Sequence, residues 1–174
     1  KYLKQKFPKI NLKLIILDDN SEKKNLELIK RVSQFEESSE IISLDHNKYK
    51  SLIKEQKSLE TFSNLSSLLN SFEIGKDRGE DLVFFVEDDY LHFETMLEEM
   101  LSSFQRISTQ LNKDIFMCPS DYPYNYMNNE KTNILIGNKR HWRTIDKTLC
   151  TFLTSKKLID KYWDNLKKNL RKSP

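Results

Sequence analysis

Short apolar runs alternate with longer amphipathic stretches along this chain. Leu82–Val86 is the most apolar run and predicts a buried central strand. Leu26, Ile29 and Val32 recur at the spacing of an amphipathic helix. The whole pattern predicts strands over residues 12–17, 41–44, 82–86, 115–118 and 134–136. It predicts helices over residues 22–36, 58–74, 93–107 and 156–170. Gly75 is expected to close the second of these helices.

Alternation of strands and helices at short spacing predicts the α/β class. We expect a mostly parallel sheet with helices on both faces, as in a Rossmann-like fold. Three glycines and four prolines leave few natural linkers, so residues 1–174 are expected to form a single domain. Ligands of such sheets bind at the carboxyl ends of the strands, and two acidic clusters fall at such ends.

Composition and charge exclude some functional classes from what we expect of this protein. Lysine and arginine number 29 and aspartate and glutamate 26, and both signs are mixed along the chain, so no nucleic-acid partner is expected. The longest apolar run is far below the roughly 20 residues of a membrane helix, so no transmembrane segment is expected. Cys118 and Cys150 are expected to be buried free thiols. These features favour a cytoplasmic protein, with peripheral attachment to a membrane as the alternative.

The first acidic cluster is Glu87-Asp88-Asp89, directly after the most apolar run. If the strand continues, Glu87 and Asp89 lie on one side of it. Carboxylate oxygens there are suited to Mn²⁺ or Mg²⁺, with phosphates completing the coordination. The simpler interpretation is that these acids cap the helix expected from Phe93.

The second cluster, Asp18-Asp19-Asn20-Ser21, follows the first predicted strand. Its simpler interpretation is a strand-to-helix turn in which Ser21 caps the next helix. A carboxylate at a strand end can also accept hydrogen bonds from a nucleobase N–H or from ribose hydroxyls. The second interpretation gains weight from the presence of the other acidic cluster.

Together these motifs resemble the GT-A-fold glycosyltransferases, and glycosyltransferase family 2 in particular. Residues 15–21 look like the nucleotide-binding segment of that family, and residues 83–89 look like its metal-binding DXD segment. Asn64, in the segment Thr61–Asn64, is at the place where such enzymes carry an asparagine beside the nucleotide. The resemblance covers about residues 10–120.

The resemblance implies a metal-dependent transferase of the hexosyl- or N-acetylhexosaminyltransferase type. It would move a sugar from a UDP- or GDP-sugar to a glycan or another hydroxyl acceptor, with inversion, using Mn²⁺ or Mg²⁺. The implied metal ligands are Asp89, Glu87 and His141. The implied donor-nucleotide residues are Asp18, Asp19, Ser21, Asn64, Glu87, Asp88 and Arg143.

The chain departs from the family pattern in two ways. The family usually has one more strand before the strand that leads into Asp18-Asp19-Asn20-Ser21, and here only residues 1–9 precede that strand. The chain is therefore expected to be a single domain of this type, or a fragment that lacks the first strand and the C-terminal part. The acidic general base of the family has no clear counterpart, and Asp121 and Asp146 are the candidates.

A basic cluster and a tyrosine-rich loop add further candidates. In the cluster Lys139–Arg143, Arg143 has the planar donors that suit a pyrophosphate. Tyr122, Tyr124 and Tyr126 follow a predicted strand and could stack on an acceptor sugar. The alternative for this loop is that it folds back over the core.

Two other functions compete with glycosyl transfer. A sugar nucleotidyltransferase would normally have a glycine-rich phosphate loop, which this chain lacks. A non-catalytic domain that binds a nucleotide or a glycan would retain the acidic clusters without needing a base.

Overall fold

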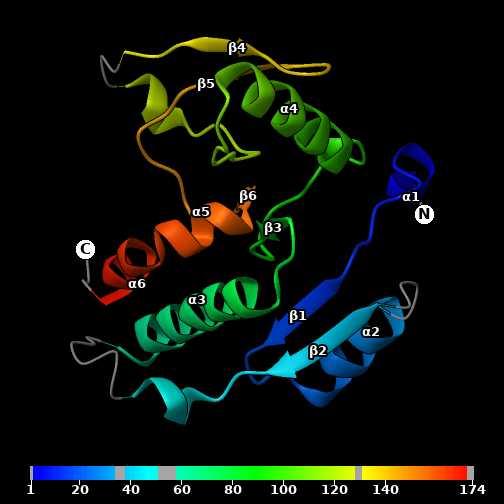
Figure 1. The fold of residues 1–174 in the computed structure, drawn as a ribbon. Helices are drawn as coiled ribbons and strands as arrows, with labels where there is room; N and C mark the ends of the chain where they lie inside the picture. The colour runs from blue at the N-terminus through cyan, green and yellow to red at the C-terminus, as the bar shows by residue number, and fades with distance from the viewer. Residues whose placement is uncertain (1, 34–37, 51–57, 128–130, 172–174) are drawn as a thin grey trace. The chain divides into compact units, whose positions relative to one another are not determined.

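The computed structural model describes residues 2–33, 38–50, 58–127 and 131–171 (Figure 1). Helices make up about 47% of it and strands about 16%, so the predicted mixture of helices and strands is confirmed. The chain divides into two compact units. Unit A comprises residues 7–74 and 164–174, and unit B comprises residues 1–6 and 75–163. The expectation of one domain over residues 1–174 stays a prediction.

Unit A contains a strand–helix–strand motif. Strands β1 (Leu14–Asp18) and β2 (Ser39–Ser43) pair in parallel, from Leu14 opposite Ser39 to Asp18 opposite Ser43. Helix α2 (Lys23–Ser33) lies between them in sequence and packs on β2. The two predicted strands are confirmed, with bounds shifted by one to two residues. Residues 34–36, the end of the predicted helix, lie outside the described residues.

The remaining described elements of unit A are a 3₁₀ helix and two α-helices, which extend into unit B by a few residues. The 3₁₀ helix η1 spans His46–Tyr49, and Asp45 caps it by accepting a hydrogen bond from the Asn47 N–H at 3.0 Å. Helix α3 runs from Leu59 to Arg78 and crosses from unit A into unit B at Gly75. Helix α6 spans Trp163–Arg171, and all of it but Trp163 belongs to unit A.

Gly75 does not end α3, contrary to expectation. It is buried within the helix, and a Cβ atom there would lie 2.5 Å from the Phe85 Cζ atom. Glycine is therefore needed for the close approach of α3 to the next strand, and helix termination is not its role.

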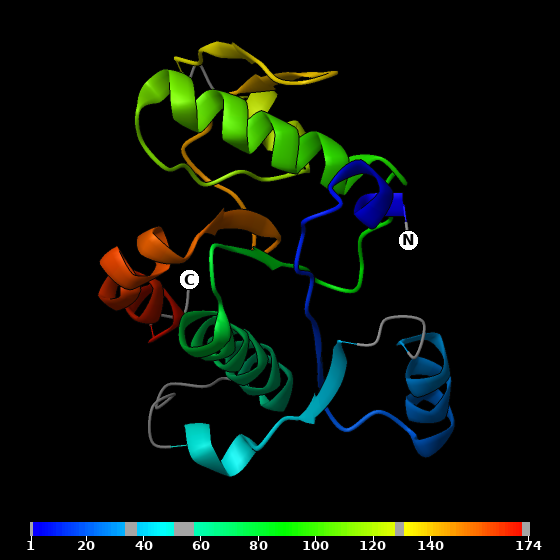
Figure 2. The ribbon, with the colours of Figure 1, turned by 45° about the vertical axis from the view of Figure 1, so that its right-hand side comes forward.

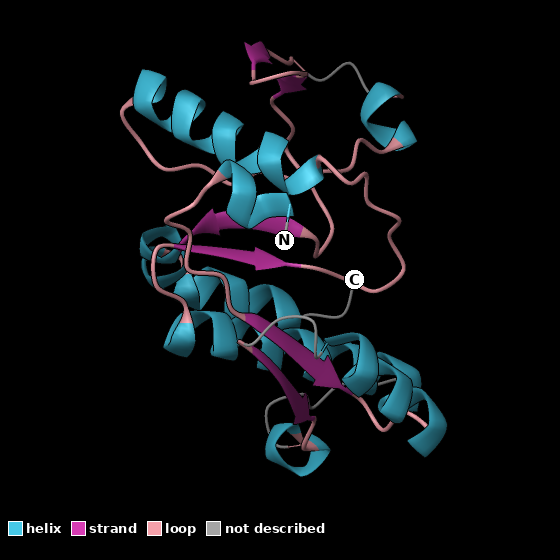
Figure 3. Ribbon diagram, turned by 90° about the vertical axis from the view of Figure 1, so that its right-hand side faces the viewer, coloured by secondary structure: helices cyan, strands magenta, loops and turns pink. Residues whose placement is uncertain are grey.

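Unit B has two small antiparallel sheets, seen as separate strand pairs in Figure 3. One pairs β3 (Leu82–Phe85) with β6 (Phe152–Ser155), and the other is a hairpin of β4 (Ile134–Ile136) and β5 (His141–Arg143). The other elements of this unit are α1 (Tyr2–Lys6), α4 (Met96–Leu111), the 3₁₀ helix η2 (Pro123–Tyr126) and α5 (Lys156–Lys161).

The hydrophobic core of unit B forms beneath α4. Met100 and Phe104 of α4 are buried against Met117 and Leu153. Partly buried side chains surround this cluster: Leu82, Phe84, Met96, Leu101, Ile115 and Trp142. Met100 and Phe104 lie four residues apart, so this face of α4 points into the core.

The expected mostly parallel sheet is not what the described residues form. They contain three two-stranded sheets, and only β1–β2 is parallel. The strand predicted over residues 115–118 is wrong, because only Met117 pairs, through one bridge to Leu153. The helix predicted over residues 156–170 is broken at Tyr162 into α5 and α6. No helix in the described part of the chain is long and apolar enough to cross a membrane.

A buried carboxylate joins α4 to the β4–β5 hairpin, which lies along this helix in Figure 2. Glu99 is 5% exposed and accepts five hydrogen bonds at 2.7–3.3 Å. The donors are the Ser103 hydroxyl, the Trp142 indole and the backbone N–H groups of Asn138, Lys139 and Arg140. Because three of them are backbone groups of the hairpin turn, Glu99 fixes the position of that turn.

Hydrogen bonding decides the acidity of Glu99. Burial alone would raise the pKa of its carboxyl group. The bonds from Ser103, the Lys139 N–H, Trp142 and the Asn138 N–H outweigh burial and lower this pKa below its usual value. Glu99 is therefore expected to stay ionised at neutral pH.

Replacing Glu99 with Gln is expected to lower the free energy of unfolding by about 2–3 kcal/mol, because an amide NH₂ would face N–H groups that need an acceptor. A urea titration followed by tryptophan fluorescence measures this, since Trp142 and Trp163 are the two tryptophans and both belong to unit B. The control is Glu80→Gln at an exposed turn, with an expected change of under about 0.5 kcal/mol. An equal effect of the two changes would contradict the role given to Glu99.

The stabilisation by Glu99 should also depend on pH. A carboxyl group whose pKa is lowered by folding stabilises the protein at pH values above its unfolded pKa, and this contribution is lost as the pH falls through the folded-state pKa. The urea midpoints of the wild type and of Glu99→Gln are therefore expected to converge below about pH 4. A constant difference between the midpoints from pH 7 to pH 3 would contradict this expectation.

Candidate functional site

In unit A, the Asp19 carboxylate directly follows β1 and is held by donors from three segments. Its Oδ1 atom lies 2.5 Å from His46 Nε2 and 3.4 Å from Asn20 Nδ2. Its Oδ2 atom accepts a hydrogen bond from the Ser63 hydroxyl. The segments are the β1–α2 turn, η1 and the first turns of α3, so the carboxylate is fixed in orientation.

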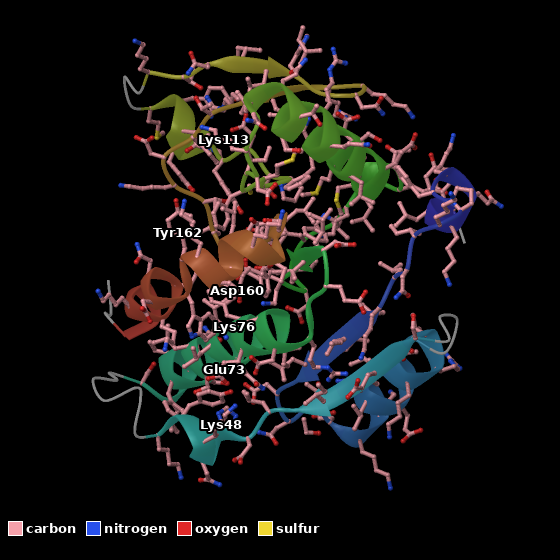
Figure 4. The ribbon with its side chains drawn as sticks, viewed as in Figure 1. Lys48, Glu73, Lys76, Lys113, Asp160 and Tyr162 are labelled. Carbon is pink, nitrogen blue, oxygen red and sulfur yellow. The ribbon has the colours of Figure 1, made fainter. Side chains whose placement is uncertain are left out.

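Helix η1 is anchored to α3, and this anchoring positions His46. Lys48 Nζ and the Tyr49 hydroxyl lie 2.6 and 2.8 Å from Glu73 Oε2, and Lys48 and Glu73 face each other in Figure 4. Tyr49 is fully buried, and burial raises its pKa to about 12. The His46 ring packs on Phe62, with 5.7 Å between ring centroids.

Asp18, Ser21 and Asn64 are the other residues of unit A that were predicted to bind the nucleotide of the sugar donor. Asp18 is 6% exposed, and its backbone carbonyl accepts a hydrogen bond of 2.8 Å from the Leu44 N–H. Ser21 and Asn64 are exposed. The helix segment predicted to lie beside the nucleotide does reach Asp19, but through Ser63 and not through Asn64.

In unit B, the acidic triplet lies in a turn beyond the end of β3. The strand ends at Phe85, so the alternation of a strand does not govern the directions of Glu87 and Asp89. Helix α4 begins only at Met96 and carries its own acids, Glu98 and Glu99, in its first turn. The capping interpretation of the triplet is therefore not supported.

Thr151 holds the first acid of the triplet. The Glu87 N–H donates to the Thr151 hydroxyl oxygen at 3.0 Å, and this hydroxyl lies 3.4 Å from Glu87 Oε2. Burial, and then the charge of Asp89, raise the pKa of Glu87 above its usual value. Burial, with a smaller effect from Glu87, raises the pKa of Cys150 to about 11, so this cysteine stays a thiol at neutral pH.

The last two acids of the triplet are open to solvent. Asp88 and Asp89 are exposed, and neither pairs with a cationic side chain in the part of the chain that the structure describes. Three consecutive carboxyl groups thus share a small region with uncompensated negative charge. Oxygen donors of this kind suit Mn²⁺ or Mg²⁺.

The tyrosine loop is tied to the segment that follows the triplet. The hydroxyl groups of Tyr90 and Tyr122 are hydrogen bonded to each other. Tyr122 and Tyr124 stack with 5.4 Å between centroids and 6° between planes. Tyr124 and Tyr126 are exposed, at 37% and 69%. The loop therefore presents aromatic surface to solvent.

Asp121 and Arg143 form an ion pair at this loop. Arg143 Nη2 and Nε lie 2.7 and 3.2 Å from Asp121 Oδ1, and Oδ2 accepts a hydrogen bond from the Tyr126 hydroxyl. Burial alone would raise the pKa of Asp121, but the hydrogen bonds from Tyr126, Arg143 and Asn125 lower it. Arg143 also lies 4.1 Å from the centre of the Tyr126 ring.

This pairing bears on two of the sequence predictions. A base with a lowered pKa is weaker, so Asp121 is poorly suited to general-base catalysis in this state. Arg143 already has a carboxylate partner where a diphosphate was expected. Asp146 is exposed.

The structure does not bring His141 into a ligand group with Glu87 and Asp89. His141 is exposed at the start of β5, opposite Ile136. No group of three or more His, Cys, Asp or Glu side chains with metal-binding geometry occurs among the residues described.

Three residues that contact Asp19 or Glu87 were not predicted from the sequence. His46 had no assigned function, Ser63 was passed over for its neighbour Asn64, and Thr151 had no predicted role. Their partners lie 27, 44 and 64 residues away in sequence. Residue spacing along the chain therefore could not predict these three contacts.

Comparisons with family models, curated proteins and solved structures find no match to this chain.

Replacing Arg143 with Gln is expected to raise the pKa of Asp121 towards its ordinary value, since the change removes a positive charge and at least one hydrogen bond. Carboxyl ¹³C NMR over a pH titration measures this pKa. Arg140→Gln serves as the control, because Arg140 stacks on Phe93, 5.4 Å from its ring centre. An unchanged Asp121 pKa in Arg143→Gln would contradict the assigned pairing.

Proposed function

We propose that this chain is a metal-dependent glycosyltransferase of the GT-A type. It takes a UDP- or GDP-sugar as donor and a glycan or another hydroxyl compound as acceptor. The observation that carries the proposal is the acidic triplet directly after β3, with three carboxyl groups together and a raised pKa at Glu87. Such crowding of like charges is costly unless a cation binds.

Asp89 and Glu87 are the residues that would hold Mn²⁺ or Mg²⁺. The donor set fits, because both are hard oxygen ligands and Asp89 is exposed. A metal ion here would neutralise charge on the leaving diphosphate. Thr151 orients Glu87 through its backbone N–H and side chain, and Asp88 is available for ribose or sugar hydroxyls.

Asp19 is the residue proposed to bind the nucleobase. Its carboxylate is fixed by His46 and Ser63, so it does not need to be ordered when a ligand arrives. Buried Asp18 supports the turn through its backbone bond to Leu44, and its part in binding is indirect.

The tyrosine loop is the proposed acceptor site. Exposed Tyr124 and Tyr126 offer ring faces to the C–H surfaces of a sugar. Asp121 positions Tyr126 through a hydrogen bond and is kept ionised by Arg143. Inversion requires a base that takes the acceptor proton, and Asp146 remains a candidate for that role.

One observation favours a second function. Asp121, a candidate base, is engaged by Arg143 and Tyr126, and its pKa is lowered. A non-catalytic domain that binds a nucleotide or a glycan would need no base. Turnover distinguishes the two, because only the enzyme would hydrolyse a sugar nucleotide slowly when Mn²⁺ is present.

Thermal unfolding with nucleoside diphosphates tests the proposed function. A diphosphate at about 100 times its Kd adds roughly 2.7 kcal/mol of stability, which corresponds to a rise in Tm of about 5–10 °C at this chain length. We expect this rise with UDP or GDP only when Mn²⁺ is present. Asp89→Asn should abolish the rise because it removes a charged metal ligand.

The control for this experiment is Asp160→Asn. Asp160 is an exposed carboxylate of α5 that pairs with Lys156, and its replacement should keep the full rise. No rise for the wild type with any diphosphate and Mn²⁺, or a full rise for Asp89→Asn, would contradict the proposal.

A further inference from the structure

The outer face of the β4–β5 hairpin carries exposed apolar side chains. Leu135 lies opposite Trp142 in this hairpin, and Trp142 packs on the core beneath α4. Because side chains alternate along a strand, Ile134 and Ile136 are on the other face, away from α4. They are 64% and 59% exposed. The solvent face of a half-buried strand is ordinarily polar, so two exposed isoleucines in a strand of three residues indicate a contact surface.

A ring from the tyrosine loop extends this face. Arg143 lies opposite Ile134 in the hairpin, and the centre of the Tyr126 ring is 4.1 Å from its guanidinium group. Tyr126 is itself exposed. We call Ile134, Ile136 and Tyr126 the hairpin patch. All three belong to unit B, so the patch does not depend on where unit A lies.

Cationic residues flank the hairpin patch. Residues 131–147 contain five lysine or arginine residues and a single acidic residue. Lys139 and Arg143 already have carboxylate partners. Lys131, just before β4, and Arg140, in the β4–β5 turn, are exposed, and neither pairs with a carboxylate among the residues that the structure describes. Uncompensated positive charge therefore lies at both ends of the exposed isoleucines.

This combination of side chains favours one kind of partner. A second copy of the chain would bring two positively charged hairpins together, and their repulsion opposes self-association. A nucleic acid would pair with the cations but leave the isoleucines in water. The surface of a membrane with anionic lipids offers phosphates to the cations and acyl chains to the isoleucines, and it requires no matching shape.

We propose that the outer face of the β4–β5 hairpin binds the surface of membranes that contain anionic lipids. Ile134 and Ile136 bind at the boundary between headgroups and acyl chains, where Tyr126 lies at headgroup level. Lys131 and Arg140 contact lipid phosphates and keep their charged ends in water. None of these residues is a proposed metal or nucleotide ligand, so membrane binding is independent of the proposed function.

Co-sedimentation of the whole chain with lipid vesicles tests this binding. The vesicles contain either phosphatidylcholine alone or phosphatidylcholine mixed with phosphatidylserine. We expect binding to the mixed vesicles to be at least about tenfold tighter, because each cation near an anionic surface contributes about fivefold. Added salt should weaken binding to the mixed vesicles, since it screens this attraction.

Variants of the two isoleucines separate apolar contact from charge. Ile134→Thr/Ile136→Thr keeps β-branched residues in the strand but removes apolar area, so binding to mixed vesicles should weaken about tenfold or more. Ile134→Leu/Ile136→Leu keeps the apolar area and should bind as the wild type does. Circular dichroism checks that each variant folds, and Ile136→Thr alone, with a several-fold loss, replaces the double variant if that one does not fold.

The charge is tested at the turn of the hairpin. Arg140→Gln should weaken binding to the mixed vesicles about fivefold. Leu111→Thr and Lys113→Gln are the matched controls, because Leu111 is 43% exposed at the end of α4 and Lys113 is exposed just after it. Both lie outside the hairpin, and both variants should bind vesicles as the wild type does.

Several outcomes would overturn this proposal. One is a wild type that does not bind the mixed vesicles. Another is equal binding of the wild type and Ile134→Thr/Ile136→Thr, which would show adsorption by charge alone. A third is a dimer of the wild type in analytical ultracentrifugation without lipid that this variant dissociates, because the hairpin patch would then contact a second copy. An equal loss of binding in Leu111→Thr would also contradict the assigned surface.

Discussion

The buried carboxylate of Glu99 is the interaction on which the architecture of unit B depends. Five donors converge on it, and three of them are backbone N–H groups of the β4–β5 turn. The hairpin has only three residues in each strand and could not be stable alone. Glu99 holds it on α4, and Gly137 permits the close approach, since a Cβ atom there would lie 2.4 Å from Trp142 Nε1.

The number of donors around each carboxylate separates structural acids from candidate ligand sites. Glu99 is buried with five donors, and Asp121 has Arg143 and Tyr126, so their acceptor positions are largely satisfied. Asp19 is hydrogen bonded through both carboxylate oxygens, to His46 and Asn20 on Oδ1 and to Ser63 on Oδ2. Asp88 and Asp89 are exposed beside a carboxyl group whose pKa is raised. Of these carboxyl groups, those of Asp88 and Asp89 are therefore the most open to solvent.

Local sequence patterns predicted individual helices and strands better than they predicted which strands pair with one another. The strands at β1, β2, β3 and β4 and the helix α4 followed from apolar runs and helical spacing. The segment over residues 115–118 is as apolar as a strand but pairs only at Met117. Its neighbour β6, Phe152–Ser155, has two threonine or serine residues among four and no alternation that marks it. Residues 152–155 form a strand because they pair with β3. The periodicity of a sequence carries no information about which segments pair.

The acidic residues of the candidate site were found from the sequence, whereas the residues that control them were not. Carboxylates after apolar strands are visible because charge next to a core run is unusual. Their control comes from His46, Ser63 and Thr151, which approach from elements far along the chain. Each of these contributes one polar side chain, and its residue type also occurs elsewhere in the chain. The contacts that fix each carboxylate are therefore set by the folded arrangement, and residue spacing along the chain does not specify them.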